Sequence, residues 1–274
     1  MEGIATRSSS LHKILTSFIA NEIHRIGMDS AVLGLSGGVD SSLVAYLAAE
    51  ALGPEHVVGL IMPYKASSPE SIADARLVAG ELGIRTEEID ITPMADAYLE
   101  SYAQGASPLR RGNVLARMRM TCLYDRSVAE KGLVLGTSNK TELLLGYGTI
   151  YGDLASAINP LGDLYKTQVK ELAAQIGVPE RIVAKAPSAD LWPDQTDEAD
   201  LGFTYEQIDK LLYLLVDLRY DHKSLLEEGF DQHFIDHVYS LIQHTQYKRR
   251  LPLIAKVSGR TVDREFRYSR DWGV

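Results

Sequence analysis

The segment with the greatest chemical potential is a loop rich in glycine and serine. It reads Gly34-Leu35-Ser36-Gly37-Gly38-Val39-Asp40-Ser41-Ser42 and lies between an apolar run and a helical pattern. Adjacent glycines let backbone amides approach an anion that a Cβ would keep away. The helix that follows adds its free N–H groups and the positive end of its dipole, and three serine hydroxyls add further donors. The loop therefore predicts a phosphate-binding site.

Asp40 is unusual in an anion-binding loop, because its carboxylate repels phosphate. A divalent cation between the two groups would remove that repulsion, and Mg²⁺ prefers carboxylate, water and phosphate oxygens. The loop has neither the Gly-Lys-Ser/Thr of a Walker A motif nor the Gly-x-Gly-x-x-Gly of a dinucleotide-binding turn. The alternative interpretation is a turn that only caps a helix, with Asp40 complementing the helix dipole.

The elements around this loop alternate between buried strands and helices. Apolar runs predict strands at residues 31–35, 57–62, 84–91 and 132–136. Helical periodicity predicts helices at residues 11–28, 39–52, 69–82, 109–131, from about 139, and at 166–177, 205–218 and 231–248. This alternation predicts an α/β fold: a doubly wound, Rossmann-like parallel sheet with additional helices, in one domain over residues 1–274.

Residues 186–202 are rich in Pro, Ser, Asp and Gln and show little periodicity. The segment is long for a simple connection, which predicts a functional lid over the site. Trp192 lies in it, either to cover a nucleotide or to pack.

Composition excludes several classes of protein. The net charge is −9, from 28 Lys+Arg against 37 Asp+Glu, which disfavours a nucleic-acid partner because such a protein needs a basic surface. No apolar run is long enough for a membrane span, so no membrane partner is expected. The single cysteine, Cys122, excludes an internal disulfide and suits a reducing cytoplasm. The sequence predicts a cytoplasmic enzyme.

The motif Ser-Gly-Gly-Val-Asp-Ser at residues 36–41 resembles the pyrophosphate loop of ATP pyrophosphatases of the adenine-nucleotide α-hydrolase type. Those enzymes cleave ATP between its α and β phosphates and activate a substrate oxygen as an adenylate. The rest of the chain resembles the NAD synthetase family in its short, ammonia-using form. The matching segments, in order, are Asn113 to Met120, Gly136-Thr137-Ser138-Asn139-Lys140-Thr141-Glu142, Tyr151-Gly152-Asp153, Leu164-Tyr165-Lys166-Thr167, Lys185 to Leu191, and Tyr247-Lys248-Arg249.

The resemblance implies an activity and its partners. The expected reaction amidates deamido-NAD with ammonia and converts ATP to AMP and pyrophosphate, with Mg²⁺ as cofactor. It implies an adenine nucleotide α-hydrolase-like fold and one synthetase domain over residues 1–274, with no glutaminase domain. Free ammonia or a separate partner protein would supply the nitrogen. Family members are homodimers, and residues 11–28 and 109–131 are the helices expected at the subunit interface.

The resemblance also implies roles for individual residues. Asp40 and Lys166 are the expected catalytic residues, Asp40 and Glu142 the magnesium ligands, and Arg117 and Lys248 the contacts to deamido-NAD. The expected ATP contacts are Gly34, Leu35, Ser36, Gly37, Gly38, Val39, Asp40, Ser41, Thr137, Lys166 and Ser188.

Elementary chemistry supports some of these roles and leaves alternatives open. The helix dipole disfavours a lysine at the start of a helix, so the presence of Lys166 there indicates an anionic ligand. A cation at this position would stabilise the charge on departing pyrophosphate. Thr137 and Ser188 can equally be helix caps, and Glu142 a first-turn acid. Arg117, with Arg110, Arg111 and Arg119, can be part of a solvated face, and Lys248 a complement to a helix end.

Several positions depart from the family pattern: Val39 stands where many relatives have glutamine, and Tyr247 where some have histidine. Ile150 and Ala157 stand where some bacterial relatives have a lysine and an aspartate on the substrate, so contacts on the nicotinate side are not transferred to this chain. Two other functions compatible with the loop are a different adenylating ATP pyrophosphatase, similar to GMP synthetase, and a non-catalytic nucleotide-binding module.

Overall fold

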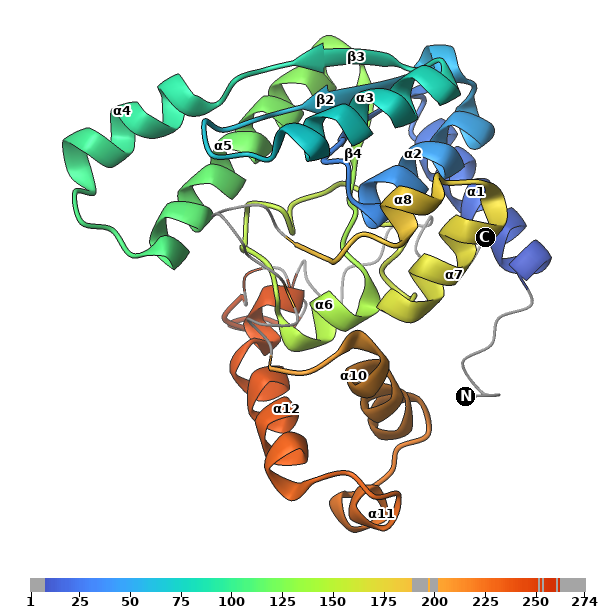
Figure 1. Cartoon of the computed structure of the whole chain (residues 1–274), viewed down its shortest axis with the longest axis vertical. Helices are drawn as coiled ribbons and strands as arrows, with labels where there is room; N and C mark the ends of the chain where they lie inside the picture. Colours follow the sequence, from blue (N-terminus) through green and yellow to red (C-terminus); the bar gives the residue numbers. More distant parts are fainter. Residues whose placement is uncertain are drawn as a thin grey trace.

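The core of the molecule is a parallel β-sheet (Figure 1). The computed structural model describes residues 8–188, 197, 202–250, 252, 254–259 and 261. Among them, four strands pair in the order β3-β2-β1-β4, all in parallel. They are β1 (Ser30–Gly34), β2 (Val57–Ile61), β3 (Arg85–Glu88) and β4 (Gly132–Leu135). The predicted parallel sheet is confirmed, although the edge strand β3 is shorter than the predicted 84–91.

Helices cover both faces of the sheet, as a doubly wound fold requires. One face packs against α1 (Ser8–His24), α2 (Val39–Leu52), α3 (Pro69–Leu82) and α7 (Lys166–Ile176). The other face packs against α4 (Thr92–Tyr102) and α5 (Pro108–Ala129). Adjacent residues of a strand point to opposite faces, so Leu33 joins the first core and Val32 the second.

The order of the strands determines where a ligand binds. From β1 the chain proceeds to β2 and β3 on one side, and then crosses to β4 on the other side of β1. In open parallel sheets, ligands bind outside the carboxyl ends of the two strands at which the connections diverge. Here those strands are β1, followed by the glycine loop, and β4, followed by residues 136–139.

A second group of helices, which extends downward from α6 in Figure 1, has an apolar core of its own. Its members are α6 (Lys140–Leu145), α10 (Tyr205–Leu212), η2 (Tyr213–Asp217), α11 (His222–Glu227), α12 (Gln232–His244) and η3 (Gln246–Arg249). Tyr205, Ile208 and Ile235 are fully or almost fully buried there. The short η1 (Pro54–His56) and α8 (Glu180–Val183) complete the described elements. None of the described helices is long and apolar enough to cross a membrane.

Several helical segments differ from the sequence prediction. Helices α4, α8 and α11 have no predicted counterpart. The predicted helix 205–218 is α-helical only to Leu212 and continues as a π-helical turn. The predicted helix 231–248 ends at His244, where Thr245 bonds back to Leu241 and a 3₁₀ turn follows. The break matters for the site, because it sets the position of Lys248.

Candidate active site

The glycine loop has the backbone shape that its sequence predicts. Gly37 has a φ of +78°, and a Cβ built there would lie 2.1 Å from the carbonyl oxygen of Ser71. The serine hydroxyls bond within the loop: Ser41 Oγ lies 3.0 Å from Ser36 Oγ and donates to Gly38 O at 3.1 Å. No side chain caps the first turn of α2. The hydroxyls therefore brace the loop, and the start of α2 remains available for an anion.

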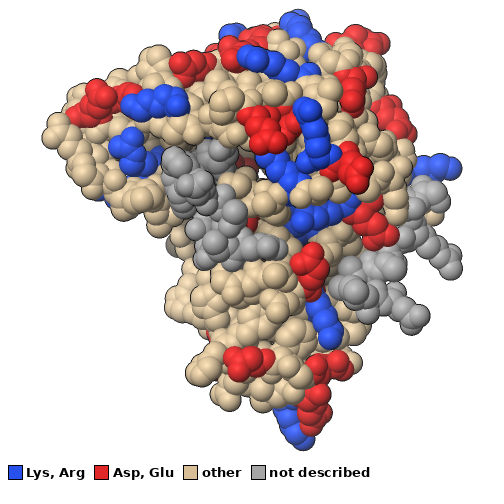
Figure 2. All heavy atoms as spheres, viewed as in Figure 1, with Lys and Arg blue, Asp and Glu red and all other residues tan. Residues whose placement is uncertain are grey.

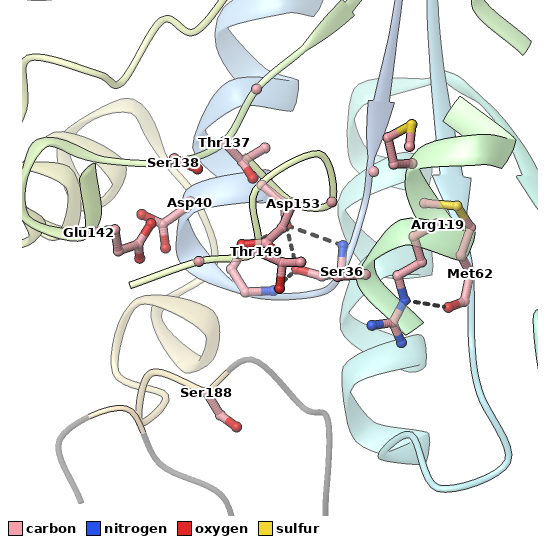
Figure 3. A pocket seen from close by; sticks show the side chains of 18 of the residues that line it. Ser36, Asp40, Met62, Arg119, Thr137, Ser138, Glu142, Thr149, Asp153 and Ser188 are labelled. Carbon is pink, nitrogen blue, oxygen red and sulfur yellow. Dashed lines mark hydrogen bonds between the residues drawn. The ribbon is translucent and has the colours of Figure 1, made fainter. Parts of the chain in front are cut away.

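Three charged side chains meet beside this loop. Lys166, only 3% exposed, donates from Nζ to Asp40 Oδ2, and the same Nζ lies 3.5 Å from Glu142 Oε1. Figure 3 shows Asp40 and Glu142 directed toward one another. The three side chains belong to the first turns of α2, α6 and α7. The sheet thus brings together residues that lie far apart in the sequence.

Glu142 serves both the helix and the site. Its backbone N–H donates to Asn139 Oδ1 at 3.0 Å, and its Oε2 accepts from Asn139 N at 3.2 Å, which is a capping box. Asn139 also donates from Nδ2 to Asp40 Oδ1 at 3.0 Å. The cap at the start of α6 therefore fixes both carboxylates relative to each other.

Burial and charge shift the titration of this cluster. Burial raises the pKa of Glu142 to about 8, and the Asp40 charge adds to this effect, against the attraction of Lys166. Burial lowers the pKa of Lys166, but the charges of Asp40 and Glu142 outweigh it, so the pKa is raised. Lys166 therefore stays protonated. The raised pKa of Glu142 indicates that the two acidic side chains together favour one more positive charge, either a proton or a metal ion.

The donor set fits Mg²⁺. Two facing carboxylates are what Mg²⁺ usually takes from a protein when substrate phosphates and water supply its other ligands. The described part of the chain contains no group of three or more His, Cys, Asp or Glu side chains that could hold a metal by themselves. A magnesium ion here would thus depend on a bound phosphate, which the adjacent glycine loop is shaped to hold.

A buried aspartate that the sequence analysis missed supports the cluster. Asp209, 1% exposed on α10, accepts from Thr141 Oγ1 at 2.5 Å and from the backbone N–H of Thr167 at 2.8 Å. Thr141 Oγ1 in turn accepts from the N–H of Lys166 at 3.1 Å. One carboxylate therefore ties the starts of α6 and α7 together. The sequence alone does not predict this role of Asp209, because Thr141 and Thr167 are far from it in the chain.

Asp197 is a second acidic residue that the sequence analysis missed. It is 4% exposed and lines the pocket. The phenol groups of Tyr147 and Tyr205 each donate to it at 3.1 Å, and burial raises the pKa of its carboxyl, against the attraction of Lys166. It belongs to the predicted lid 186–202, most of which, including Trp192, lies outside the described residues.

The pocket around these groups has a volume of about 1040 Å³, at the upper end for small-molecule sites. Its lining contains all the residues predicted for ATP, for the metal and for deamido-NAD: Gly34 to Ser41, Thr137, Glu142, Lys166, Ser188, Arg117 and Lys248. The structure thus brings every predicted site residue to one pocket, while their individual roles stay predictions. Arg119 also lines it, whereas Arg110 and Arg111 are not among the described lining residues.

The two cations predicted for the dinucleotide are held by main-chain carbonyls. Arg117 Nε and Nη2 each donate to Ile150 O at 3.4 Å. Lys248 Nζ donates to Gly146 O and Gly148 O, both at 2.8 Å. Arg119 donates to Met62 O at 3.0 Å (Figure 3). The described hydrogen bonds of Arg117 and Lys248 are thus to neutral main-chain acceptors. Burial lowers the pKa of Lys248, against the charge of Asp153.

Comparisons with known proteins show which family the sequence and the fold resemble. The model of the NAD synthase family matches residues 11–252. The NH(3)-dependent NAD(+) synthetase of Trichlorobacter lovleyi is 57% identical over 273 residues, which is 100% of both chains. A solved NH3-dependent NAD synthetase from Campylobacter jejuni has a TM-score of 0.78 and 34% identity, over 92% of this chain and 100% of that one. The solved NMN synthetase of Francisella tularensis has a TM-score of 0.82 and 31% identity, and the match covers 92% of this chain and 99% of that one.

The buried bridge at Asp209 yields a first prediction. In Asp209→Asn, the amide nitrogen must face one of the two donors, Thr141 Oγ1 or Thr167 N, and leave it without an acceptor. We expect the free energy of unfolding in urea to fall by about 1–3 kcal/mol. We also expect weaker binding of Mg·ATP, because the starts of α6 and α7 are no longer tied together.

Asp163→Asn is the matched control. Asp163 is 95% exposed and pairs with Lys140 at 3.2 Å, so its loss should change the stability by less than about 1 kcal/mol. Equal effects of the two variants on unfolding and on Mg·ATP binding would contradict the role given to Asp209.

Proposed function

Because the chain belongs to the NAD synthase family, we propose that it amidates deamido-NAD with ammonia and converts ATP to AMP and pyrophosphate. The observation that carries this proposal is the buried group of Asp40, Lys166 and Glu142 beside the glycine loop. The 57% identity to a protein named for the same reaction, over the full length of both chains, supports the choice of substrate. The enzyme is accordingly a ligase that forms a C–N bond.

The chemistry requires activation of a carboxylate. The nicotinate carboxylate is a poor electrophile, because its leaving group would be oxide. A carboxylate oxygen therefore attacks the α-phosphorus of ATP, the bond to the bridging oxygen of the β-phosphate breaks, and pyrophosphate departs. Ammonia then adds to the carbonyl carbon of the adenylate, AMP leaves, and loss of a proton from nitrogen gives the amide.

The residues of the chain contribute positioning and charge. In the proposed complex, the amides at the start of α2 hold phosphate oxygens, and protonated Lys166 stabilises the charge that develops on them. Asp40 and Glu142 hold the magnesium ion, which neutralises phosphate charge when it is bound. Thr137 and Ser188 are proposed to contact ATP from the same pocket.

Arg117 and Lys248 are proposed to hold the phosphates of deamido-NAD. The described hydrogen bonds of both side chains are to neutral main-chain carbonyls. Arg117 is oriented by the carbonyl of Ile150, which any residue at that position supplies. The departure from the family at Ile150 therefore leaves the orientation of Arg117 unaffected, although it removes a charged side chain.

The deciding experiment measures pyrophosphate and the dinucleotide product together. ATP, Mg²⁺, ammonium and deamido-NAD are supplied, and each is omitted in turn. We expect release of pyrophosphate that requires deamido-NAD and yields NAD in equal amounts. Release of pyrophosphate that does not depend on deamido-NAD would favour another adenylating enzyme. Binding of ATP without release of pyrophosphate would favour a nucleotide-binding module.

Two further arms define the substrates. Nicotinate mononucleotide replaces deamido-NAD in one, because a protein of the same fold is named an NMN synthetase. Glutamine replaces ammonium in the other. We propose that the chain acts as one synthetase domain without a glutaminase, so ammonium should support turnover and glutamine should not. A higher kcat/KM with the mononucleotide than with deamido-NAD would overturn the choice of acceptor.

The magnesium assignment yields its own prediction. Asp40→Asn keeps the shape of the side chain and removes one of the two carboxylate ligands. We expect kcat to fall at least ~100-fold, a magnitude typical of losing an electrostatic contact to the transition state, and half-saturation to require more Mg²⁺. Asp125→Asn, at an acid that is 74% exposed, is the control. Wild-type activity and magnesium dependence in Asp40→Asn would refute the assignment.

We propose a homodimer that uses α1 and α5. Apolar side chains are exposed on both helices, including Ile14 at 62%, Leu109 at 68% and Val128 at 80%. Light scattering should give twice the mass of the chain at micromolar concentration. Val128→Glu should shift the mass toward the monomer, whereas Leu226→Glu, at an exposed leucine of α11, should not. A monomeric wild type would overturn the proposal.

We also propose a cytoplasmic location. The lone Cys122 is buried and free, and burial raises the pKa of its thiol. The sequence contains one cysteine, so no internal disulfide can form. The stability of the fold therefore does not depend on a disulfide that a reducing compartment would break.

A further inference from the structure

Lys185 lies beside the glycine loop, although no role follows for it from the sequence. It comes two residues after the end of α8. Its Nζ donates to Ser71 Oγ and to Asp74 Oδ2, both at 3.1 Å. The same two residues of α3 pack against Gly37, where a built Cβ would lie 2.1 Å from Ser71 O and 3.1 Å from Asp74 Cβ. The ammonium group therefore adjoins the loop, and Lys185 lines the pocket.

The charges around Lys185 leave a positive excess. Asp74, 2% exposed, pairs through Oδ2 with Lys185 and through Oδ1 with Arg181 Nη2 at 2.7 Å. One buried carboxylate thus faces two cations. In Figure 2, acidic and basic side chains gather together on the face over α3 and α8. The positive charge that Asp74 does not balance is available to an anion in the pocket.

The other cations of the pocket are placed differently. Lys166 is paired with Asp40 and Glu142, so any phosphate shares its charge with these two acids. Lys248 bonds to Gly146 and Gly148, and Arg117 to Ile150. Arg119 donates to Met62 O and to Ser67 Oγ, before the start of α3. Lys185 is 27% exposed in its side chain, so it can reach a ligand while it stays close to Asp74. Its described contacts are to α3, whereas the proposed magnesium ligands lie in the first turns of α2 and α6.

We propose that Lys185 binds the pyrophosphate end of ATP and stabilises it as the leaving group. The inference rests on the proposed function, in which pyrophosphate departs from the α-phosphorus. As the nicotinate oxygen bonds to that phosphorus, the electron pair of the breaking bond stays on the bridging oxygen, and pyrophosphate gains one negative charge. Lys185 stabilises that charge as an ammonium without giving up a proton, and Asp74 holds the lysine in place.

The test uses Lys185→Met, Lys185→Arg and a matched control, Arg181→Met. Arg181 shares Asp74 with Lys185 but is absent from the described lining of the pocket, and its side chain is 57% exposed. The dissociation constant of Mg·pyrophosphate is measured by calorimetry, and kcat and KM for each substrate by NAD formation. Melting temperatures verify that each variant folds, and Lys185→Gln replaces Lys185→Met if that variant does not.

We expect Lys185→Met to weaken pyrophosphate binding and to lower kcat/KM for ATP by about 10–100-fold, the loss typical of one hydrogen bond to a charged group. The KM values for deamido-NAD and ammonium should stay within ~3-fold. Lys185→Arg should recover most of the binding, and Arg181→Met should bind pyrophosphate within ~3-fold of the wild type.

Equal pyrophosphate affinities in Lys185→Met and Arg181→Met would overturn the proposal, because Lys185 would then only balance Asp74. A wild type that does not bind pyrophosphate would overturn it as well. The calorimetric measurement does not depend on turnover. If the wild type makes no NAD but Lys185→Met selectively loses pyrophosphate, the contact of Lys185 is supported and the proposed function fails. If the wild type makes NAD and the variant keeps its affinity, only the role of Lys185 fails.

Discussion

The burial of one ammonium group, that of Lys166, is the constraint on which the site depends. A buried charge is costly unless other groups pair with it, and here Asp40 and Glu142 provide that pairing. Each of the three side chains comes from the first turn of a different helix. The strand order places those helix starts at one edge of the sheet, and the capping box of Asn139 and the bridge of Asp209 hold them there.

The same constraint separates the charges within the pocket. Acidic groups lie on the side of α2 and α6, and an excess of positive charge lies on the side of α3 and α8. A nucleotide with its magnesium ion carries the complementary pattern of charge. Groups that bind the native state add to its stability, so Mg·ATP should offset part of the free energy that charge burial costs the free enzyme.

The sequence predicts what depends on local patterns. Alternating apolar runs and helical periods predict the parallel sheet, and the glycines of the loop predict its shape, because both effects act between near neighbours. Helix α4 is not predicted, because its large apolar residues do not mark its buried face: the small Ala95 is buried, whereas Met94 and Tyr102 are exposed. The supporting role of Asp209 depends on partners 68 and 42 positions away, so it becomes visible only in the folded chain. The roles of Arg117 and Lys248 rest on family resemblance.

The 126 positions between Asp40 and Lys166 have a consequence for synthesis of the protein on the ribosome. A nascent chain that has formed only β1, α2 and β2 already displays the glycine loop, but lacks the lysine that compensates Asp40. Domains emerge from the N-terminus at a limited speed, and the bridge that fixes Lys166 is incomplete until Asp209 has left the exit tunnel. Nucleotide can therefore help to stabilise this enzyme only late in translation, and the earlier segments must rely on apolar packing and backbone hydrogen bonds.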